Sequence, residues 1–201
     1  MTTSLHQARL DLVIETLRAH AARGVLDLGC GTGPLLEVLA QDNFFDNIVG
    51  LDTSRQALED STRLLERAGV KIGGRIRLMN ASFTDADPNL AGFDAAVLLE
   101  TIEHIPPDRL SQVERAIFNS FRPGLVIITT PNQECNELLG VPSHRLRHPE
   151  HEFEWSRAKF EAWAGGVGTR KGYRPSFQGI GWSHPPLGAA SQMAIFVRAE
   201  A

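Results

Sequence analysis

The sequence predicts an α/β fold, with a doubly wound, mostly parallel sheet of seven strands in a single domain. Strand-like and helix-like segments alternate along the 201 residues, which is typical of such a fold. A glycine-rich turn directly follows the first of these strands, and an aspartate ends the second. The hydrophobic content of 42% and the charged content of 22% are those of a soluble globular protein with a core of its own.

The helices and strands can be placed in chain order from their apolar spacing and their capping residues. Apolar residues at helical spacing within residues 10–17 predict a helix before the first strand. Ser54 is expected to cap the helix after the second strand, and Pro106-Pro107 to open the helix after the fourth. A short helix is expected around Phe160 and Trp163. The strands are expected at residues 24–29, 47–52, 75–80, 93–99 and 125–130, and near residues 172–178 and 192–198.

Within the single domain, residues 1–201, we distinguish three parts. Residues 5–130 are expected to form a cofactor-binding core, and residues 176–201 to supply the last strands. Residues 131–175 between them are expected to form an inserted loop and helix that contribute to ligand binding. The part of this insertion before Trp155 has no clear period, and a loop of such length in a compact domain is more often functional than idle.

Composition and the ends of the chain bear on its location. No stretch of about 18 uninterrupted apolar residues occurs, which excludes a membrane span, and the first residues lack the features of a secretory signal. The two cysteines, Cys30 and Cys135, lie far apart in the sequence. We therefore expect a reducing, cytoplasmic location and no membrane partner.

The glycine-rich turn, Asp27-Leu28-Gly29-Cys30-Gly31-Thr32-Gly33, predicts a cofactor site. Its spacing is G-x-G-x-G, whereas dinucleotide-binding proteins have G-x-G-x-x-G, so the turn suits a ligand without a phosphate. Asp52 lies 19 positions after Gly33, at the end of the second strand, where a carboxylate can accept hydrogen bonds from ribose hydroxyls. Two alternatives remain, a tight turn without a ligand and an NAD site. Equilibrium binding of NADH would test the second alternative.

Over about residues 10–130, these features resemble the class I S-adenosylmethionine-dependent methyltransferases. The resemblance implies that Asp27 and Gly29 face the methionyl end of S-adenosylmethionine and that Asp52 binds its ribose. It also implies that Ser82 and Phe83 flank the adenine. Further contacts are expected from the same turn and from the end of the second strand, at Gly31, Thr32 and Thr53.

A cluster of acidic residues and a histidine follows the fourth strand, as Glu100-Thr101-Ile102-Glu103-His104. On a helical turn, residues 100, 103 and 104 would share one face, where two carboxylates repel unless a cation lies between them. A histidine from the later loop could complete the ligand shell. Carboxylate oxygens and imidazole nitrogens together fit Mn²⁺, Fe²⁺, Co²⁺ or Mg²⁺ better than a structural zinc, which prefers thiolates. Alternatively, the histidine of this cluster serves as a base or only as a structural residue.

Three segments later in the chain narrow the expected reaction and substrate. The chain resembles the small-RNA 3′-terminal 2′-O-methyltransferases in these segments, which are Thr129-Thr130-Pro131-Asn132, then Arg147-His148, and then His151-Glu152-Phe153-Glu154-Trp155-Ser156-Arg157. That family includes plant and animal small-RNA methyltransferases and a bacterial RNA-repair branch. The resemblance implies a metal-dependent transfer of methyl to the 2′ hydroxyl of the 3′-terminal nucleotide. The implied metal ligands and catalytic residues are Glu100, Glu103, His104 and His151, with Mn²⁺ or Co²⁺ favoured and Mg²⁺ also accommodated.

The expected partner is the 3′ end of an RNA. Residues 140–180 contain seven Lys/Arg and only four Glu, although the net charge of the whole chain is −4. Arg145, Arg147 and Arg157 could therefore hold terminal phosphates, because guanidinium pairs well with phosphate. His148 is a rival fourth metal ligand, but a surface position facing RNA suits it better. In the bacterial branch, a protein that heals and ligates RNA ends would be a second partner.

Two other functions remain open on the sequence. A small-molecule O-methyltransferase of the ubiquinone-biosynthesis type, acting on a catechol or polyprenyl phenol, shares Glu-x-x-Glu-His but does not account for His-x-Phe-Glu-Trp. A non-catalytic RNA-binding or regulatory module could also retain the fold. Activity on a phenol without activity on RNA would favour the first. RNA binding without methylated product would favour the second.

Overall fold

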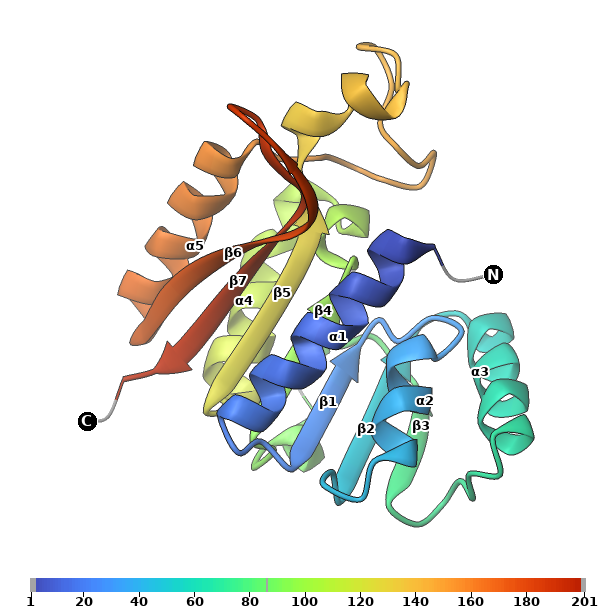
Figure 1. Ribbon diagram of the computed structural model, residues 1–201. Helices are drawn as coiled ribbons and strands as arrows, with labels where there is room; N and C mark the ends of the chain where they lie inside the picture. Colours follow the sequence, from blue (N-terminus) through green and yellow to red (C-terminus); the bar gives the residue numbers. More distant parts are fainter. Residues whose placement is uncertain (1–2, 86, 200–201) are drawn as a thin grey trace.

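Seven strands form one sheet in the order β3-β2-β1-β4-β5-β7-β6 (Figure 1). The structure is a computed structural model, and it describes residues 3–85 and 87–199. Neighbouring strands from β3 to β5 are parallel, whereas β7 runs antiparallel to β5 and β6 antiparallel to β7. The predicted doubly wound, mostly parallel sheet of seven strands is therefore confirmed.

The elements follow the predicted order along the chain. The strands are β1 (Gly24–Leu28), β2 (Asn47–Asp52), β3 (Ile76–Asn80), β4 (Ala95–Leu99), β5 (Leu125–Pro131), β6 (Tyr173–His184) and β7 (Gly188–Arg198). The α-helices are α1 (Ser4–Ala19), α2 (Pro34–Gln41), α3 (Arg55–Arg67), α4 (Leu110–Arg115) and α5 (Arg157–Lys171). A π-helical turn, η4 (Ala116–Phe121), continues α4, and a 3₁₀ turn, η3 (Pro107–Arg109), precedes it. The other 3₁₀ turns are η1 (Pro88–Leu90), η2 (Ile102–His104), η5 (Gln133–Cys135) and η6 (Glu137–Leu139).

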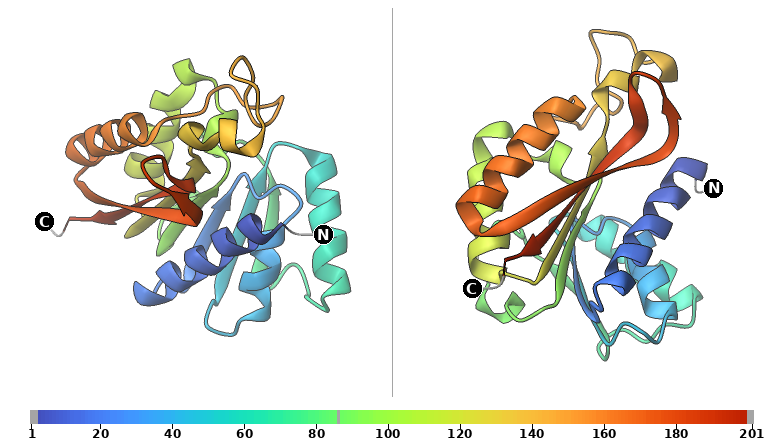
Figure 2. Two further views of the ribbon diagram at one scale, coloured as in Figure 1. Left: turned by 45° about the horizontal axis from the view of Figure 1, so that its top comes forward. Right: turned by 60° about the vertical axis from the view of Figure 1, so that its left-hand side comes forward.

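Helices cover both faces of the sheet, and each face has its own apolar core (Figures 1 and 2). Successive strand residues point to opposite faces, so Val25 packs with α1, α2 and α3 while its neighbour Leu26 packs with α4 and α5. β1, β4 and β5 are buried almost throughout, as parallel strands covered on both sides must be. Among the residues that the structure describes, no helix is long and apolar enough to span a membrane.

The strand order reverses between β1 and β4, because the chain leaves β1 towards β2 and β3 and later returns on the other side of β1. At such a reversal the loops at the carboxyl ends of the strands diverge and leave a crevice between them. The glycine-rich turn after β1 and the acidic segment after β4 both border this crevice. Residues distant in the sequence are thereby brought to one edge of the sheet.

The last two strands are longer than predicted. β6 and β7 form a hairpin whose pairing continues from Tyr173–Arg198 to His184–Gly188, with an irregularity between Ile180 and Ser183. Glycines at positions 179 and 181 weaken the strand pattern in the sequence, yet cross-strand pairing and contact with α1 carry the strand through them. In Figure 1 this hairpin rises beside β5 at the edge of the sheet that carries the crevice.

α5 is also longer than the predicted short helix. Its C-terminal half holds three glycines, which lower helix propensity by about 1 kcal/mol each. The helix nevertheless continues to Lys171, because Gly168 is packed closely against the start of β6. A Cβ atom at Gly168 would lie 2.6 Å from the carbonyl oxygen of Tyr173 and 2.7 Å from Cδ of Pro175. A close contact between helix and strand thus outweighs the unfavourable local propensity.

Candidate functional site

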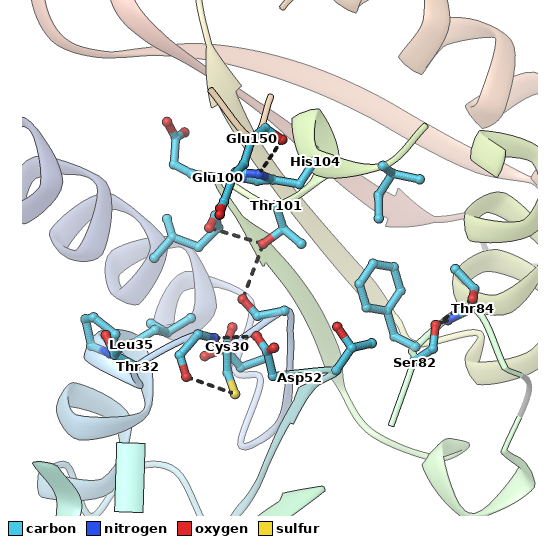
Figure 3. A pocket seen from close by; sticks show the side chains of 18 of the residues that line it. Cys30, Thr32, Leu35, Asp52, Ser82, Thr84, Glu100, Thr101, His104 and Glu150 are labelled. Carbon is cyan, nitrogen blue, oxygen red and sulfur yellow. Dashed lines mark hydrogen bonds between the residues drawn. The ribbon is translucent and has the colours of Figure 1, made fainter. Parts of the chain in front are cut away.

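A cavity of about 600 Å³ lies at the carboxyl ends of β1, β2 and β4. Figure 3 shows Thr32 and Asp52 on one side of this cavity, and Glu100, Thr101 and His104 on the other. Every residue predicted to contact the cofactor lines it, namely Asp27, Gly29, Gly31, Thr32, Asp52, Thr53, Ser82 and Phe83. The structure therefore gathers in one cavity the residues that the glycine-rich turn and the downstream acid indicated.

The glycines of the turn allow close approach between neighbouring segments. Gly29 has a φ of +78°, and a Cβ atom there would lie 2.3 Å from Cγ2 of Thr101, just after β4. Gly33 has a φ of +87°, and its Cβ would lie 2.3 Å from Oγ of Ser61 in α3. Left-handed backbone together with such contacts excludes a side chain at both positions. The turn can pack against both neighbouring elements only with glycine at these two places.

Asp52 is held rigidly at the cavity wall. Its Oδ2 accepts a hydrogen bond of 2.8 Å from the backbone N–H of Gly31, and its Oδ1 accepts one of 2.8 Å from that of Ser54. Ser54 in turn caps α3, as predicted, by accepting from the backbone N–H of Ala57. Each carboxylate oxygen of Asp52 has a further lone pair for a ligand hydroxyl. The acid thus links the first two loops and still faces the cavity.

Asp27 is the other acid of the cavity, and it is buried. Its side chain lies at the end of β1, and Oδ2 has no hydrogen-bond partner among the described residues. Burial, with a smaller contribution from the charge of Asp52, raises the pKa of Asp27 to about 7. A cationic ligand group beside Oδ2 would remove this penalty, because an opposite charge favours the ionised carboxylate.

The structure corrects one expectation for the segment after β4. Glu100 has a φ of +52°, and the helical turn η2 begins only at Ile102, so Glu100 does not share a helical face with Glu103 and His104. The Glu100 carboxylate instead pairs with Arg9 of α1, with Nη2 and Oε2 2.6 Å apart. Ser191 Oγ also donates to Glu100 Oε1, at 3.0 Å. These contacts hold Glu100 outside the group described next.

Glu103, His104 and His151 form the cluster that could hold a metal ion. Each offers one ligand atom, and these atoms lie within 4.8 Å of one another. Two polar contacts join the later loop to η2. The backbone N–H of Glu152 donates to Glu103 O at 2.8 Å, and the side-chain nitrogen Nδ1 of His104 lies 3.1 Å from Glu150 O. Two segments nearly fifty residues apart in the sequence therefore meet in one site.

Glu103 is a buried carboxylate whose surroundings favour a positively charged partner. Its side chain is fully buried, Oε2 accepts a hydrogen bond of 3.0 Å from Thr130 Oγ1, and Oε1 is without a partner in the part of the chain that the structure describes. Burial, and next the nearby charge of Glu100, raise the pKa of Glu103 well above its ordinary value. Burial and the neighbouring His151 lower the pKa of His104, which favours the neutral imidazole. This donor set suits a cation.

His148 lies close to the cluster without joining it. Its ring centroid is 5.6 Å from that of His151 and 6.1 Å from that of His104, whereas the latter two are 4.9 Å apart. The His148 side chain is 52% exposed, and Nδ1 accepts from the backbone N–H of Glu150 at 3.2 Å. This geometry agrees with preferring His151 over His148 as the ligand.

The predicted RNA-binding arginines differ in their surroundings. Arg145 is exposed on the loop. Arg147 instead turns inward, where its guanidinium donates to three oxygen acceptors of the protein and does not face the surface as a phosphate ligand would. Arg157 is likewise engaged, because Nε donates to Glu134 and Nη2 to the carbonyl oxygen of Pro186, both at 2.6 Å. Sequence alone cannot tell a guanidinium facing solvent from one bound by backbone carbonyls.

Four residues around the site were not anticipated. Arg9 and Ser191 hold Glu100, Thr130 donates to Glu103, and Asn136 donates to Glu154 beside His151. Thr130 lies within one of the quoted motifs, which could have drawn attention to it. The other three lie outside those motifs, and only the fold brings them to the site.

Comparisons with known proteins agree with this geometry. A family model described as a methyltransferase domain matches residues 25–124. The small RNA 2′-O-methyltransferase of Mus musculus is 33% identical over 96% of this chain and 51% of its own length. The chain thus spans about half the length of that curated relative.

Solved structures give the same result over the whole chain. The methyltransferase domain of bacterial CtHen1-C is 38% identical with a TM-score of 0.86, over 98% of this chain and 100% of that one. The small RNA methyltransferase HEN1 is 32% identical with a TM-score of 0.88, over 98% of this chain and 26% of that one. The chain therefore belongs to the small RNA 2′-O-methyltransferase family and has the fold of its methyltransferase domain.

Proposed function

We propose that the chain transfers the methyl group of S-adenosylmethionine to the 2′ hydroxyl of the 3′-terminal nucleotide of RNA, at a site that holds one divalent cation. The cluster of Glu103, His104 and His151 carries this proposal. His104 belongs both to this cluster and to the cavity wall. A ribose bound at the cluster would therefore lie beside the methyl donor in the cavity.

In the cavity, the chain's own residues would hold the two ends of S-adenosylmethionine, which supplies an activated methyl group. Asp27 Oδ2, buried and without a partner among the residues described, would accept hydrogen bonds from the methionyl amino group. Asp52, anchored by two backbone N–H groups, would accept hydrogen bonds from the ribose hydroxyls. Ser82 and Phe83, on the cavity wall after β3, would flank the adenine.

A divalent cation fits the cluster because the donor set combines a buried carboxylate with two imidazoles. Mn²⁺ and Co²⁺ suit such mixed ligands best, and Mg²⁺ is also accommodated. A bound cation would supply positive charge that lowers the pKa of a ribose hydroxyl. Glu103, His104 and His151 would hold it, and Glu100 would be the fourth ligand after leaving Arg9.

For the RNA itself, we expect Arg145 and His148 to face the substrate, since both are exposed on the loop that carries His151. A basic side chain on phosphate positions an RNA end without reading its bases, so base preference should be weak. The activity, the RNA 3′ end as partner and a cytoplasmic location are proposals for this chain. If the chain belongs to the bacterial branch, we also propose a protein partner that heals and ligates RNA ends.

The decisive test supplies labelled S-adenosylmethionine, Mn²⁺ and short RNAs that end in a free ribose. We expect labelling of these RNAs and no labelling of RNAs that end in a 2′-deoxy nucleotide. Removal of the cation with a chelator should abolish the reaction, and added Mn²⁺ should restore it. Equal labelling of the 2′-deoxy control, or methylation of a catechol with none of RNA, would contradict the proposal.

Alanine substitutions separate the cluster from the cofactor cavity. Replacing Glu100, Glu103, His104 or His151 singly should abolish methylation while leaving equilibrium binding of S-adenosylhomocysteine within about twofold, because these side chains serve the RNA end. Replacing Asp52 should instead weaken S-adenosylhomocysteine binding. A cluster variant that keeps full activity would remove its residue from the proposed site.

A further inference from the structure

Arg147 is bound by three protein oxygens, two from the stretch after β5 and one from β7. Its Nε donates to Asn136 Oδ1 at 2.6 Å, its Nη1 donates to the carbonyl oxygen of Ala190 at 2.8 Å, and its Nη2 donates to that of Asn132. These acceptors lie after β5, between η5 and η6, and in β7. Arg147 therefore fastens the loop that carries His151 to the end of the sheet.

Glu154 connects Arg147 to His151. Its Oε1 accepts from the backbone N–H of Arg147 at 2.7 Å and lies 2.6 Å from His151 Nδ1, while Oε2 accepts from Asn136 Nδ2 at 2.6 Å. Glu154 is only 5% exposed and Asn136 only 7%. A buried carboxylate with this many partners has one orientation available, because rotation would leave polar groups without hydrogen bonds.

The contact with Glu154 decides which nitrogen of His151 faces the cluster. A carboxylate accepts hydrogen bonds and cannot donate them, so His151 Nδ1 must carry the proton. The other ring nitrogen, Nε2, then has a lone pair free for an ion. The same arrangement recurs at His104, where Nδ1 lies 3.1 Å from the carbonyl oxygen of Glu150. In both histidines Nδ1 is thus occupied by a protein oxygen, and Nε2 is the nitrogen left for an ion.

We propose that Asn136, Arg147 and Glu154 form a positioning network that sets the ring orientation and the tautomer of His151. The network acts through His151 and contacts neither the ion nor the RNA. Its use for ion binding rests on the proposed function, whereas the orientation of His151 does not. The inward-facing Arg147 is thereby assigned to building the site rather than to holding a phosphate.

The tautomer is measured on the metal-free chain of residues 1–201 by NMR of ¹⁵N-labelled histidines at alkaline pH. We expect the Nδ1–H tautomer of His151 in the wild type and a shift towards the Nε2–H tautomer in Glu154→Gln. The Nε2–H tautomer in the wild type would overturn the proposal. Because this readout needs no metal, it stays informative even if the chain binds no cation.

Calorimetric titration with Mn²⁺ tests the consequence for ion binding. Glu154→Gln should weaken Mn²⁺ binding by about 10- to 100-fold, as loss of an outer partner of a ligating histidine does. Glu152→Gln is the matched control, because this neighbouring acid is exposed and its loss changes the charge equally. We expect the control to stay within twofold of the wild type. Equal losses in both variants would overturn the proposal.

A pair of variants at Arg147 separates positioning from phosphate binding. Arg147→Lys keeps the charge but cannot reach three acceptors, so Mn²⁺ binding should weaken as much as in Arg147→Met. The opposite result would be weaker RNA binding in Arg147→Met, unchanged RNA binding in Arg147→Lys and unchanged Mn²⁺ binding in both. That result would assign Arg147 to the RNA and overturn the proposal. A wild type that binds no Mn²⁺ contradicts the proposed function, and the tautomer then decides the network by itself.

Discussion

Arg9 Nη2 lies 2.6 Å from Glu100 Oε2, and this ion pair joins helix α1 to the residue that follows β4. The two side chains are only 12% and 18% exposed, and Ser191 Oγ hydrogen-bonds to both of them. An ion pair this far from solvent is screened less than one on the surface. A cation that takes Glu100 as a ligand would therefore compete with Arg9 for this carboxylate.

We therefore predict that Arg9→Met binds Mn²⁺ more tightly than the wild type. Without Arg9, Glu100 loses an ion pair that competes with the metal, and a positive charge near the site is removed. The affinity for Mn²⁺ should therefore improve by about fivefold, which corresponds to about 1 kcal/mol. Calorimetric titration measures this, with Arg9→Lys as the control that keeps the charge. Weaker binding in Arg9→Met would mean that Arg9 prepares Glu100 for the ion.

Asp27 should make the stability of the ligand-free protein depend on pH. Its pKa is about 7 in the folded state, against an ordinary value of 3.8, so the folded state holds the extra proton between these values. The stabilising contribution is complete below the ordinary pKa and is lost as the pH rises through 7. The free energy of unfolding should fall relative to Asp27→Asn by on the order of 1 kcal/mol per pH unit within this window. Urea denaturation at several pH values checks the difference between the two proteins.

Ligand binding should show the opposite trend with pH. A cationic amino group beside Asp27 binds best to the ionised carboxylate, so affinity for S-adenosylhomocysteine should rise about tenfold between about pH 6 and pH 8. In Asp27→Asn the affinity should be weaker and nearly independent of pH. The measurement is equilibrium binding of S-adenosylhomocysteine. A wild-type affinity that does not change over this range would exclude the amino group as the partner of Asp27.

Thr130→Val should destabilise the protein because Glu103 Oε2 would lose the donor that it has at 3.0 Å. Leaving a buried polar atom without its hydrogen bond costs about 1–3 kcal/mol of the free energy of unfolding. Thr130→Ser keeps the hydroxyl and is the control, with the smaller loss of one methyl group. Equal destabilisation of the two variants in urea denaturation would show that the hydrogen bond contributes little.

Two glycines of α5 should respond in opposite ways to alanine. At Gly168 a Cβ atom would lie 2.6 Å from the backbone oxygen of Tyr173, so Gly168→Ala should cost about 1–3 kcal/mol through overpacking. At Gly165, apart from its chain neighbours and the helix's own backbone, no heavy atom of the described structure lies within 4 Å of an added Cβ, so Gly165→Ala should stabilise the helix by about 0.5–1 kcal/mol. Thermal unfolding of the two variants decides, and stabilisation by both would show that helix and strand can move apart.

Much of the cavity could be predicted from the sequence because its wall comes from short loops at strand ends. Asp27 lies near the end of β1, Gly29 follows it directly, and Asp52 ends β2, so predicting the strands also predicted the positions of these residues. The expectation that His151 lies beside His104 followed from the two motifs that contain them, which resemble those of a known family. The Ser191–Glu100 contact could not be predicted in this way, because it joins residues 91 positions apart outside any such pattern.

By itself, the sequence determined the order of the elements and the edge of the sheet that carries the site, since apolar periodicity and turn residues act between near neighbours in the chain. Its motifs also indicated the family. Only the tertiary structure decided what the side chains do there. It turned Arg147 inward, directed Glu100 to Arg9 and left one oxygen of Glu103 without a partner among the residues it describes. The reason is physical, because a hydrogen bond depends on the positions of two atoms to within a fraction of an ångström, and packing between distant segments sets those positions.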